Sequence, residues 1–130
     1  MSFAYSALHH SCTSSCSLSF HSPFTEHMDL QGNDLGGLLP TELGLMTGLT
    51  YLDLSDNIFS SGIPTEIGNM TSLISFDVRS NTMTGLLPTE LGLLTRLEYF
   101  SAAGNSFHGT LPREIGNQIG RAQSELQSRP

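Results

Sequence analysis

Four kinds of residue recur along this chain at a single interval of 24 positions. Each asparagine of the series is followed by a proline after seven residues, a glutamate after nine and a glycine after 11. A fixed period between about 20 and 50 residues predicts a repeat architecture whose core forms by stacking of units. The asparagines, which we expect to form a structural ladder, are Asn33, Asn57, Asn81 and Asn105.

Within each unit the apolar residues predict a short strand followed by a short helical segment. Leu52-Asp53-Leu54 alternates apolar and polar residues, as expected of a strand with one buried face. Further along, a Pro-Thr-Glu-Leu/Ile-Gly segment, with Arg in place of Thr in the last unit, predicts a first helical turn, because Pro favours that position and Glu is favourable near the N-terminal end. The glycine that follows makes a long helix unfavourable, so we expect a short helical or 3₁₀ segment.

These patterns resemble the plant-specific, 24-residue type of leucine-rich repeat. The first motif reads LxxLxLxxN from Leu49 to Asn57, and the second is the NxLxGxIP pattern, matched from Asn33 to Pro40 with Leu39 in place of Ile. The resemblance implies an α/β repeat solenoid, a right-handed curved superhelix with a parallel sheet on the concave face and short helical or 3₁₀ segments on the convex side. It also implies a second, shorter strand before each proline. One departure is Ser61, which stands where a glycine is expected.

Family members of this kind include the ectodomains of receptor-like kinases and receptor-like proteins and polygalacturonase-inhibitor proteins. Their usual role is the recognition of proteins, peptides or small ligands, often in signalling. The resemblance therefore suggests an extracellular or cell-surface location, although no signal peptide or transmembrane segment is recognisable in the sequence.

The repeat register divides the chain into three parts. Residues 1–24 form a Ser/His-rich segment that we expect to be disordered or an irregular cap, 25–120 hold four repeats, and 121–130 form a polar tail or cap. Alternatively, the two end segments are not caps, and the chain is a piece of a longer array of repeats. Cys12 and Cys16, with nearby histidines, match no strong zinc-finger spacing, so we predict no metal, and their role stays open.

Charge and composition exclude several classes of function. The 130 residues contain five Arg, no Lys and 12 acids, for a net charge of −7. This balance argues against nucleic acid and anionic lipid as partners, which require basic surfaces. No set of residues positions a nucleophile, so we predict no enzyme activity and no cofactor.

Strand alternation predicts three outward columns on the concave face, because the side chains between buried apolar residues point outward. The columns are His27, Tyr51, Ser75 and Tyr99; Asp29, Asp53, Asp77 and Ser101; and Gln31, Ser55, Arg79 and Ala103. The candidate ligand-binding residues from this set are His27, Asp29, Tyr51, Asp53, Ser55, Asp77, Arg79 and Tyr99.

The acidic column has three interpretations. It is a solvated polar row, an anionic stripe that receives a basic peptide, or, with further oxygen ligands, a calcium site. Tyr51 and Tyr99 are either recognition anchors or simply good strand residues. Arg79 either binds a carboxylate of a partner or pairs with Asp53 or Asp77.

Asn69-Met70-Thr71 is an N-glycosylation acceptor triplet, expected on the turn after the helical segment. Taken together, the sequence predicts a non-catalytic, receptor-like or inhibitor-like module that recognises a protein or peptide through its concave face, with a basic partner as one candidate. The alternative is a structural or scaffold remnant, or a fragment of a longer receptor, with no ligand of its own.

Overall fold

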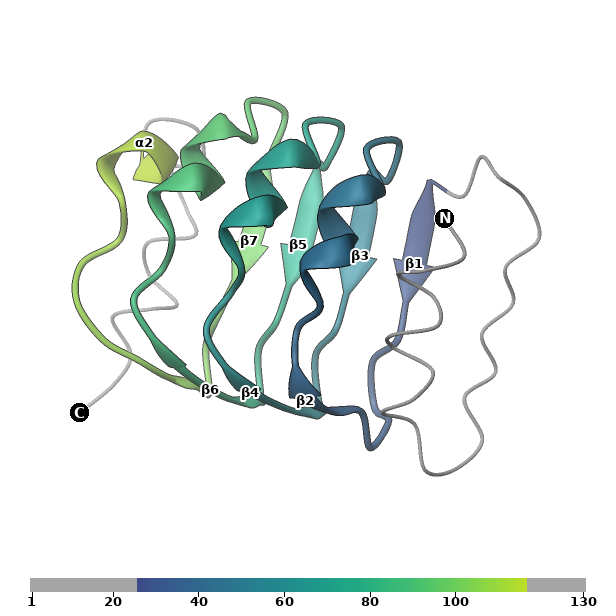
Figure 1. The fold of residues 1–130 in the computed structure, drawn as a ribbon, viewed down its shortest axis with the longest axis vertical. Helices are drawn as coiled ribbons and strands as arrows, with labels where there is room; N and C mark the ends of the chain where they lie inside the picture. The colour runs from purple at the N-terminus through teal and green to yellow at the C-terminus, as the bar shows by residue number, and fades with distance from the viewer. Residues whose placement is uncertain (1–25, 117–130) are drawn as a thin grey trace.

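The computed structural model describes residues 26–116 of the 130. The predictions for residues 1–24 and 121–130, and for Cys12 and Cys16, lie outside this range. Within it, the chain forms two parallel four-stranded sheets joined by short helices (Figure 1).

The first sheet runs along one face of the solenoid. Its strands are β1 (His27–Asp29), β3 (Tyr51–Asp53), β5 (Ser75–Asp77) and β7 (Tyr99–Ser101), in that order. Neighbouring strands are parallel and pair residues exactly one repeat apart, with Leu52 beside Met28 and Phe76 beside Leu52. The register read from the sequence is therefore confirmed. The outer face of this sheet is the concave face.

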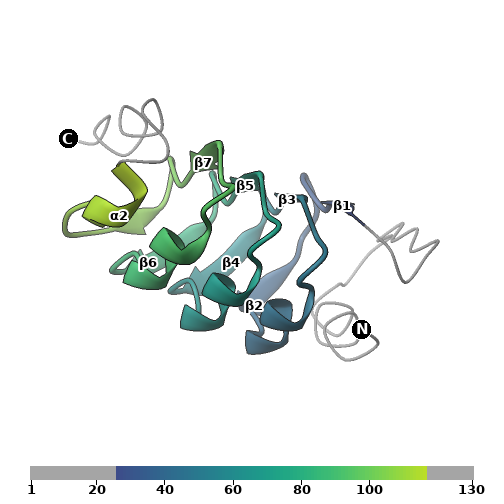
Figure 2. The same ribbon diagram turned by 90° about the horizontal axis from the view of Figure 1, so that it is seen from above.

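A second sheet lies before the prolines. It consists of β2 (Gly36–Leu38), β4 (Ile58–Ser61), β6 (Thr82–Gly85) and β8 (Ser106–Phe107). Three 3₁₀ helices and one short α-helix follow: η1 (Thr41–Leu45), η2 (Thr65–Asn69), η3 (Thr89–Leu93) and α2 (Arg113–Gly116). Figure 2 shows the helices on the side opposite the first sheet. The predicted second strand and short helical segment are both confirmed.

The glycine two residues after each glutamate allows neighbouring helices to approach closely. A Cβ atom on Gly68 would lie 2.9 Å from the backbone oxygen of Glu90, and one on Gly44 would lie 2.6 Å from the oxygen of Glu66. Both distances are shorter than real Cβ contacts, so a larger residue would push the helices apart. The recurring glycine thus sets the spacing of the convex side.

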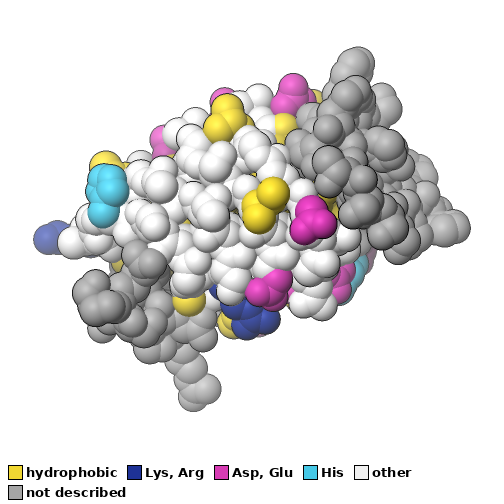
Figure 3. All heavy atoms as spheres, turned by 90° about the horizontal axis from the view of Figure 1, so that it is seen from below, with side chains coloured by type: hydrophobic (Ala, Val, Ile, Leu, Met, Phe, Trp, Pro, Cys, Tyr) yellow, Lys and Arg dark blue, Asp and Glu magenta, His cyan; other side chains and the backbone are white. Residues whose placement is uncertain are grey.

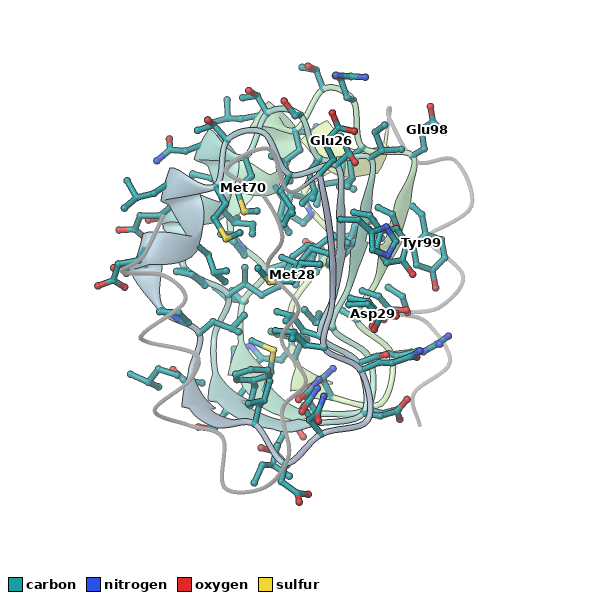
Figure 4. All side chains as sticks on the ribbon, turned by 90° about the vertical axis from the view of Figure 1, so that its right-hand side faces the viewer. Glu26, Met28, Asp29, Met70, Glu98 and Tyr99 are labelled. Carbon is teal, nitrogen blue, oxygen red and sulfur yellow. The ribbon has the colours of Figure 1, made fainter. Side chains whose placement is uncertain are left out.

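The core lies between the first sheet and the helices. Leu52, Phe76 and Phe100 fill it from successive strands, each at most 1% exposed. Met28 and Met70 turn into the same interior from opposite sides (Figure 4). Because every repeat contributes the same positions, the core is continuous along the stack, as expected of a solenoid.

Two positions of each repeat adopt left-handed backbone conformations. One of them is occupied by Gly37, Ser61, Gly85 and Gly109, all with positive φ. Ser61 has φ 65°, a conformation that costs a residue with a Cβ about 1–2 kcal/mol. The residue that departs from the repeat pattern therefore still follows the repeat's backbone, at an energetic cost.

Candidate recognition face

The asparagines join consecutive repeats through buried hydrogen bonds. The Asn57 side-chain amide donates to the backbone oxygen of Leu30 in the preceding repeat at 2.9 Å, and its oxygen accepts from the N–H of Leu35 at 3.1 Å. Asn81 and Asn105 make the same pair of contacts one and two repeats further on. These bonds satisfy backbone groups that the turn after each first-sheet strand leaves unpaired.

Asn33 differs because it begins the series. Among the described residues 26–116, its amide donates only within its own repeat, to the oxygens of Leu30 at 2.9 Å and Gln31 at 3.2 Å. It is also half-buried, whereas the other three asparagines are buried. The ladder holds the strands of the first sheet at fixed spacing and so makes its outer face rigid.

Aromatic side chains stand on that outer face. His27 and Tyr51 are neighbours in the register, and their rings stack with centroids 4.1 Å apart and an angle of 3° between planes. Tyr99 lies two strands beyond Tyr51 and is 40% exposed. Figure 4 shows Tyr99 and Asp29 on the same outer side of the first sheet. The structure thus places these predicted residues on one surface.

The expected exposure is wrong for four residues of the other columns. Asp53 and Asp77 are 5% and 4% exposed, Ser101 is 1% exposed, and Ser55 is fully buried. The reason is local hydrogen bonding. Asp53 Oδ1 accepts from the backbone N–H of Ser55 at 2.9 Å and from its hydroxyl at 2.6 Å. The serine hydroxyl is therefore turned toward the aspartate, where it is covered.

The same bond recurs along the acidic column. Asp29 Oδ1 accepts from the N–H of Gln31 at 3.1 Å, and Asp77 Oδ1 accepts from the N–H of Arg79 at 2.9 Å. An aspartate that bonds the backbone two residues on stabilises a turn, here the turn that ends each strand. The aspartates therefore have a structural task that their alternation with apolar residues does not reveal. The sequence signal that could have indicated it is an aspartate placed two residues before the chain turns.

The Oδ2 atoms of the buried Asp53 and Asp77 contact the predicted tyrosines and the predicted arginine of this face. Tyr51 Oη donates to Asp53 Oδ2 and Tyr99 Oη donates to Asp77 Oδ2, each at 3.4 Å. Arg79 Nε lies 3.5 Å from Asp77 Oδ2, while the Arg79 side chain is 45% exposed. The internal pairing expected for Arg79 is thus present, and its guanidinium remains accessible to solvent.

Burial changes the acidity of this cluster. It raises the pKa of Asp77 above its usual value, although the Arg79 backbone N–H and guanidinium act in the opposite direction. The pKa of the Tyr51 hydroxyl is raised by burial and by the carboxylates of Asp53 and Asp29. Tyr51 therefore stays a hydrogen-bond donor throughout the neutral pH range.

The side of the solenoid that carries the second sheet has few charged side chains. Figure 3 looks onto this side, where backbone and side chains that are neither charged nor hydrophobic predominate. Across residues 26–116, His, Cys, Asp and Glu form no group of three or more that could hold a metal ion. In the same range, no helix has the length and apolar character needed to cross a membrane.

Asn69 does not lie on the concave face. It is the exposed last residue of η2, rather than part of the turn that follows, on the convex side of the solenoid. It is separate from the asparagine ladder, which lies at the end of the first-sheet strands.

Comparisons with known proteins agree with this architecture. The family described as Leucine Rich Repeat matches residues 24–46 and 48–70. Among solved structures, a chain in the BIR3–SERK2 complex from Arabidopsis thaliana is 36% identical with a TM-score of 0.68, over 73% of this chain and 50% of that one. A comparison of the sequence with curated proteins found no match.

Two larger structures are similar over a smaller share of their length. The plant peptide hormone receptor RGFR1, solved with RGF2, is 36% identical with a TM-score of 0.68, over 71% of this chain and 15% of that chain. The GASSHO1/SCHENGEN3 ectodomain from Arabidopsis thaliana, solved with CASPARIAN STRIP INTEGRITY FACTOR 2, is 40% identical with a TM-score of 0.66, over 69% and 11%. This chain therefore spans half or less of each structure. It is a leucine-rich-repeat solenoid that resembles the ectodomains of plant leucine-rich-repeat receptor kinases.

Proposed function

We propose that this chain recognises a protein or peptide segment through the concave face and performs no catalysis. The observation that carries the proposal is the set of aromatic rings on a rigid sheet, with His27 stacked on Tyr51 and Tyr99 two strands away. Aromatic residues supply large contact areas and a polar tip, and they dominate the binding energy of many interfaces. The similar receptor RGFR1, a plant peptide hormone receptor by description, supports a peptide as the partner.

The charge of the face favours a basic partner. Asp29, Asp53 and Asp77 are adjacent in the register. Among residues 26–116, the one ion pair made by this column joins Asp77 to Arg79. Parallel strands are about 4.8 Å apart, so these carboxylates create a continuous negative potential along the sheet. A Lys or Arg side chain can approach the exposed Asp29 directly and can stack against the tyrosine rings. The two buried aspartates act mainly through the potential.

A random peptide display library offered to the full chain tests this proposal. We expect selected peptides to be enriched in Lys and Arg and to bind less tightly as salt is raised. Tyr51→Ala should weaken binding by about tenfold or more, as loss of an interface anchor does. Asp53→Asn removes charge while it keeps an oxygen that can accept from Ser55, so it should reduce the preference for basic peptides without loss of the turn.

The matched control is Leu45→Ala, which truncates an exposed side chain on the convex side. It should leave peptide affinity unchanged. If Tyr51→Ala and Tyr99→Ala both retain every selected peptide at full affinity, the concave face is not the binding surface. If no peptide or protein is selected at all, the chain is better described as a structural array.

A further inference from the structure

The position that Asn69 occupies is directed outward in every repeat that surrounds it. Its equivalents one repeat before and after are Leu45 and Leu93, which are 60% and 57% exposed. Asn69 is itself exposed at the end of η2. The stacked repeats therefore present this column to solvent along the convex ridge, whatever residue it holds.

The rest of the acceptor triplet has the same geometry. Thr71 is exposed, while Met70 between the two is fully buried and anchors the segment in the core. The backbone N–H of Met70 donates to the oxygen of Ile67 at 3.0 Å, and that of Leu73 donates to the oxygen of Met70 at 3.0 Å. Asn69 and Thr71 are thus held outward on either side of a fixed buried residue.

Other asparagines are already committed to the fold. Asn57, Asn81 and Asn105 are buried with their amides donating to backbone oxygens. None of these three asparagines has Ser or Thr two residues later in the chain. Asn69-Met70-Thr71 is the single Asn-x-Ser/Thr triplet of the 130 residues. An acceptor triplet at an exposed site is the requirement for N-glycosylation in a secretory compartment.

We infer that Asn69 is an N-glycosylation site, which carries a glycan when the chain enters a secretory compartment. The co-reactant is an oligosaccharide linked to a lipid through a pyrophosphate. The Asn69 side-chain nitrogen forms a bond to the anomeric carbon, the bond from that carbon to the pyrophosphate oxygen breaks, the lipid pyrophosphate leaves, and the nitrogen loses one proton.

The location has a consequence for the two faces of the solenoid. A Cβ on Gly68, the residue before Asn69, would lie 3.1 Å from Leu93 Cδ1, so Leu93 of the next repeat lies beside this part of the convex ridge. A glycan on Asn69 starts from this ridge, on the side of the core opposite the sheet that carries Tyr51 and Tyr99, and so leaves the concave face open.

The test is expression of the full chain behind a secretion leader in a eukaryotic host, followed by electrophoresis before and after peptide-N-glycosidase. We expect the chain to migrate as one slower band, by a single step in apparent mass, and the glycosidase should restore the faster band. Mass spectrometry should place the modification at Asn69. Asn69→Gln and Thr71→Ala should each abolish the step, whereas Thr71→Ser, which keeps the triplet, should retain it.

The neighbouring repeat offers a matched positive control. Leu93 is followed by Leu94 and Thr95, so Leu93→Asn creates an acceptor triplet at the equivalent position of the next repeat. It should add a second step, because the column is exposed there as well.

A secreted wild-type chain with no glycosidase-sensitive step would overturn the inference. So would a step that persists in both Asn69→Gln and Thr71→Ala. Neither result bears on peptide recognition, since the concave face lies on the opposite side of the core.

Discussion

The side-chain oxygen of Asn81 accepts a hydrogen bond from the backbone N–H of Phe59, 22 residues earlier in the chain, at 3.0 Å. The amide of the same side chain donates to the oxygen of Leu54 at 3.0 Å. One buried residue therefore satisfies two backbone groups of the preceding repeat. This relationship explains why an asparagine recurs at the same position of all four repeats.

Replacement of Asn81 by alanine should be strongly destabilising. Asn81→Ala leaves the Phe59 N–H and several carbonyl oxygens without their partner in a buried site, and each orphaned group costs about 1–3 kcal/mol. We expect a loss of about 2–4 kcal/mol in the free energy of unfolding, measured by urea denaturation. Asn33→Ala, which within residues 26–116 loses bonds to its own repeat alone, should cost at most about 1.5 kcal/mol. Equal losses for the two variants would contradict an inter-repeat ladder.

The glycine on the convex side gives a second prediction. Gly68→Ala places a Cβ 2.9 Å from the backbone oxygen of Glu90, so the helices must separate. We expect a destabilisation of about 1–3 kcal/mol by thermal or chemical unfolding, as for other overpacked sites. Gly48→Ala is the matched control, because its Cβ meets no atom within 4 Å and its φ is not positive. That variant should be neutral or more stable by about 0.5 kcal/mol.

Ser61 provides a prediction in the opposite direction. Ser61→Gly relieves a left-handed conformation that costs about 1–2 kcal/mol, although the glycine adds about 0.4–1 kcal/mol of freedom to the unfolded chain. The variant should therefore be more stable by about 0.5–1 kcal/mol. Ser60→Gly, at the adjacent position without positive φ, should be less stable than wild type. A destabilised Ser61→Gly would show that the serine hydroxyl has a role outweighing the backbone strain.

The pH dependence of stability follows from Asp77. Burial raises its pKa in the folded chain above the usual 3.8, so the folded state binds this proton more tightly than the unfolded state does. The resulting stabilisation is fully present below the usual carboxyl pKa and is lost as the pH rises through the folded pKa. Asp77→Asn, whose side-chain oxygen can still accept from the Arg79 N–H, removes this titration.

Denaturation of wild type and Asp77→Asn between about pH 3 and pH 7 measures the effect. The stability of wild type relative to the variant should fall as the pH rises. A relative stability that increases with pH would mean that the Arg79 contact dominates and that the folded pKa lies below its usual value.

Much of this fold could be predicted from the sequence because its determinants repeat. Leu52, Asn57 and Pro64 each have one structural task in every unit, so four copies reveal the strand, the ladder and the start of the helix. The departure at Ser61 was visible for the same reason. Its left-handed backbone follows from neighbouring repeats, whose glycines adopt the same conformation.

The surface was harder to predict because alternation alone decides neither burial nor hydrogen bonding. Ser55 follows the outward pattern, yet its hydroxyl turns to Asp53 and is fully covered. Asp53 and Asp77 are likewise covered, since each bonds the backbone of its own turn. The stacking of His27 on Tyr51 depends on the rotamers of two side chains on neighbouring strands, and the aligned repeats do not specify rotamers.

Hydroxyl-radical footprinting with a selected basic peptide tests the central claim most directly, because it reports the solvent access of individual side chains. If the concave face binds the peptide, oxidation of Tyr51 and Tyr99 should fall sharply in the complex, while oxidation of Leu45 and Leu93 on the convex side stays unchanged. Protection of the two leucines with no change at the two tyrosines would contradict the account.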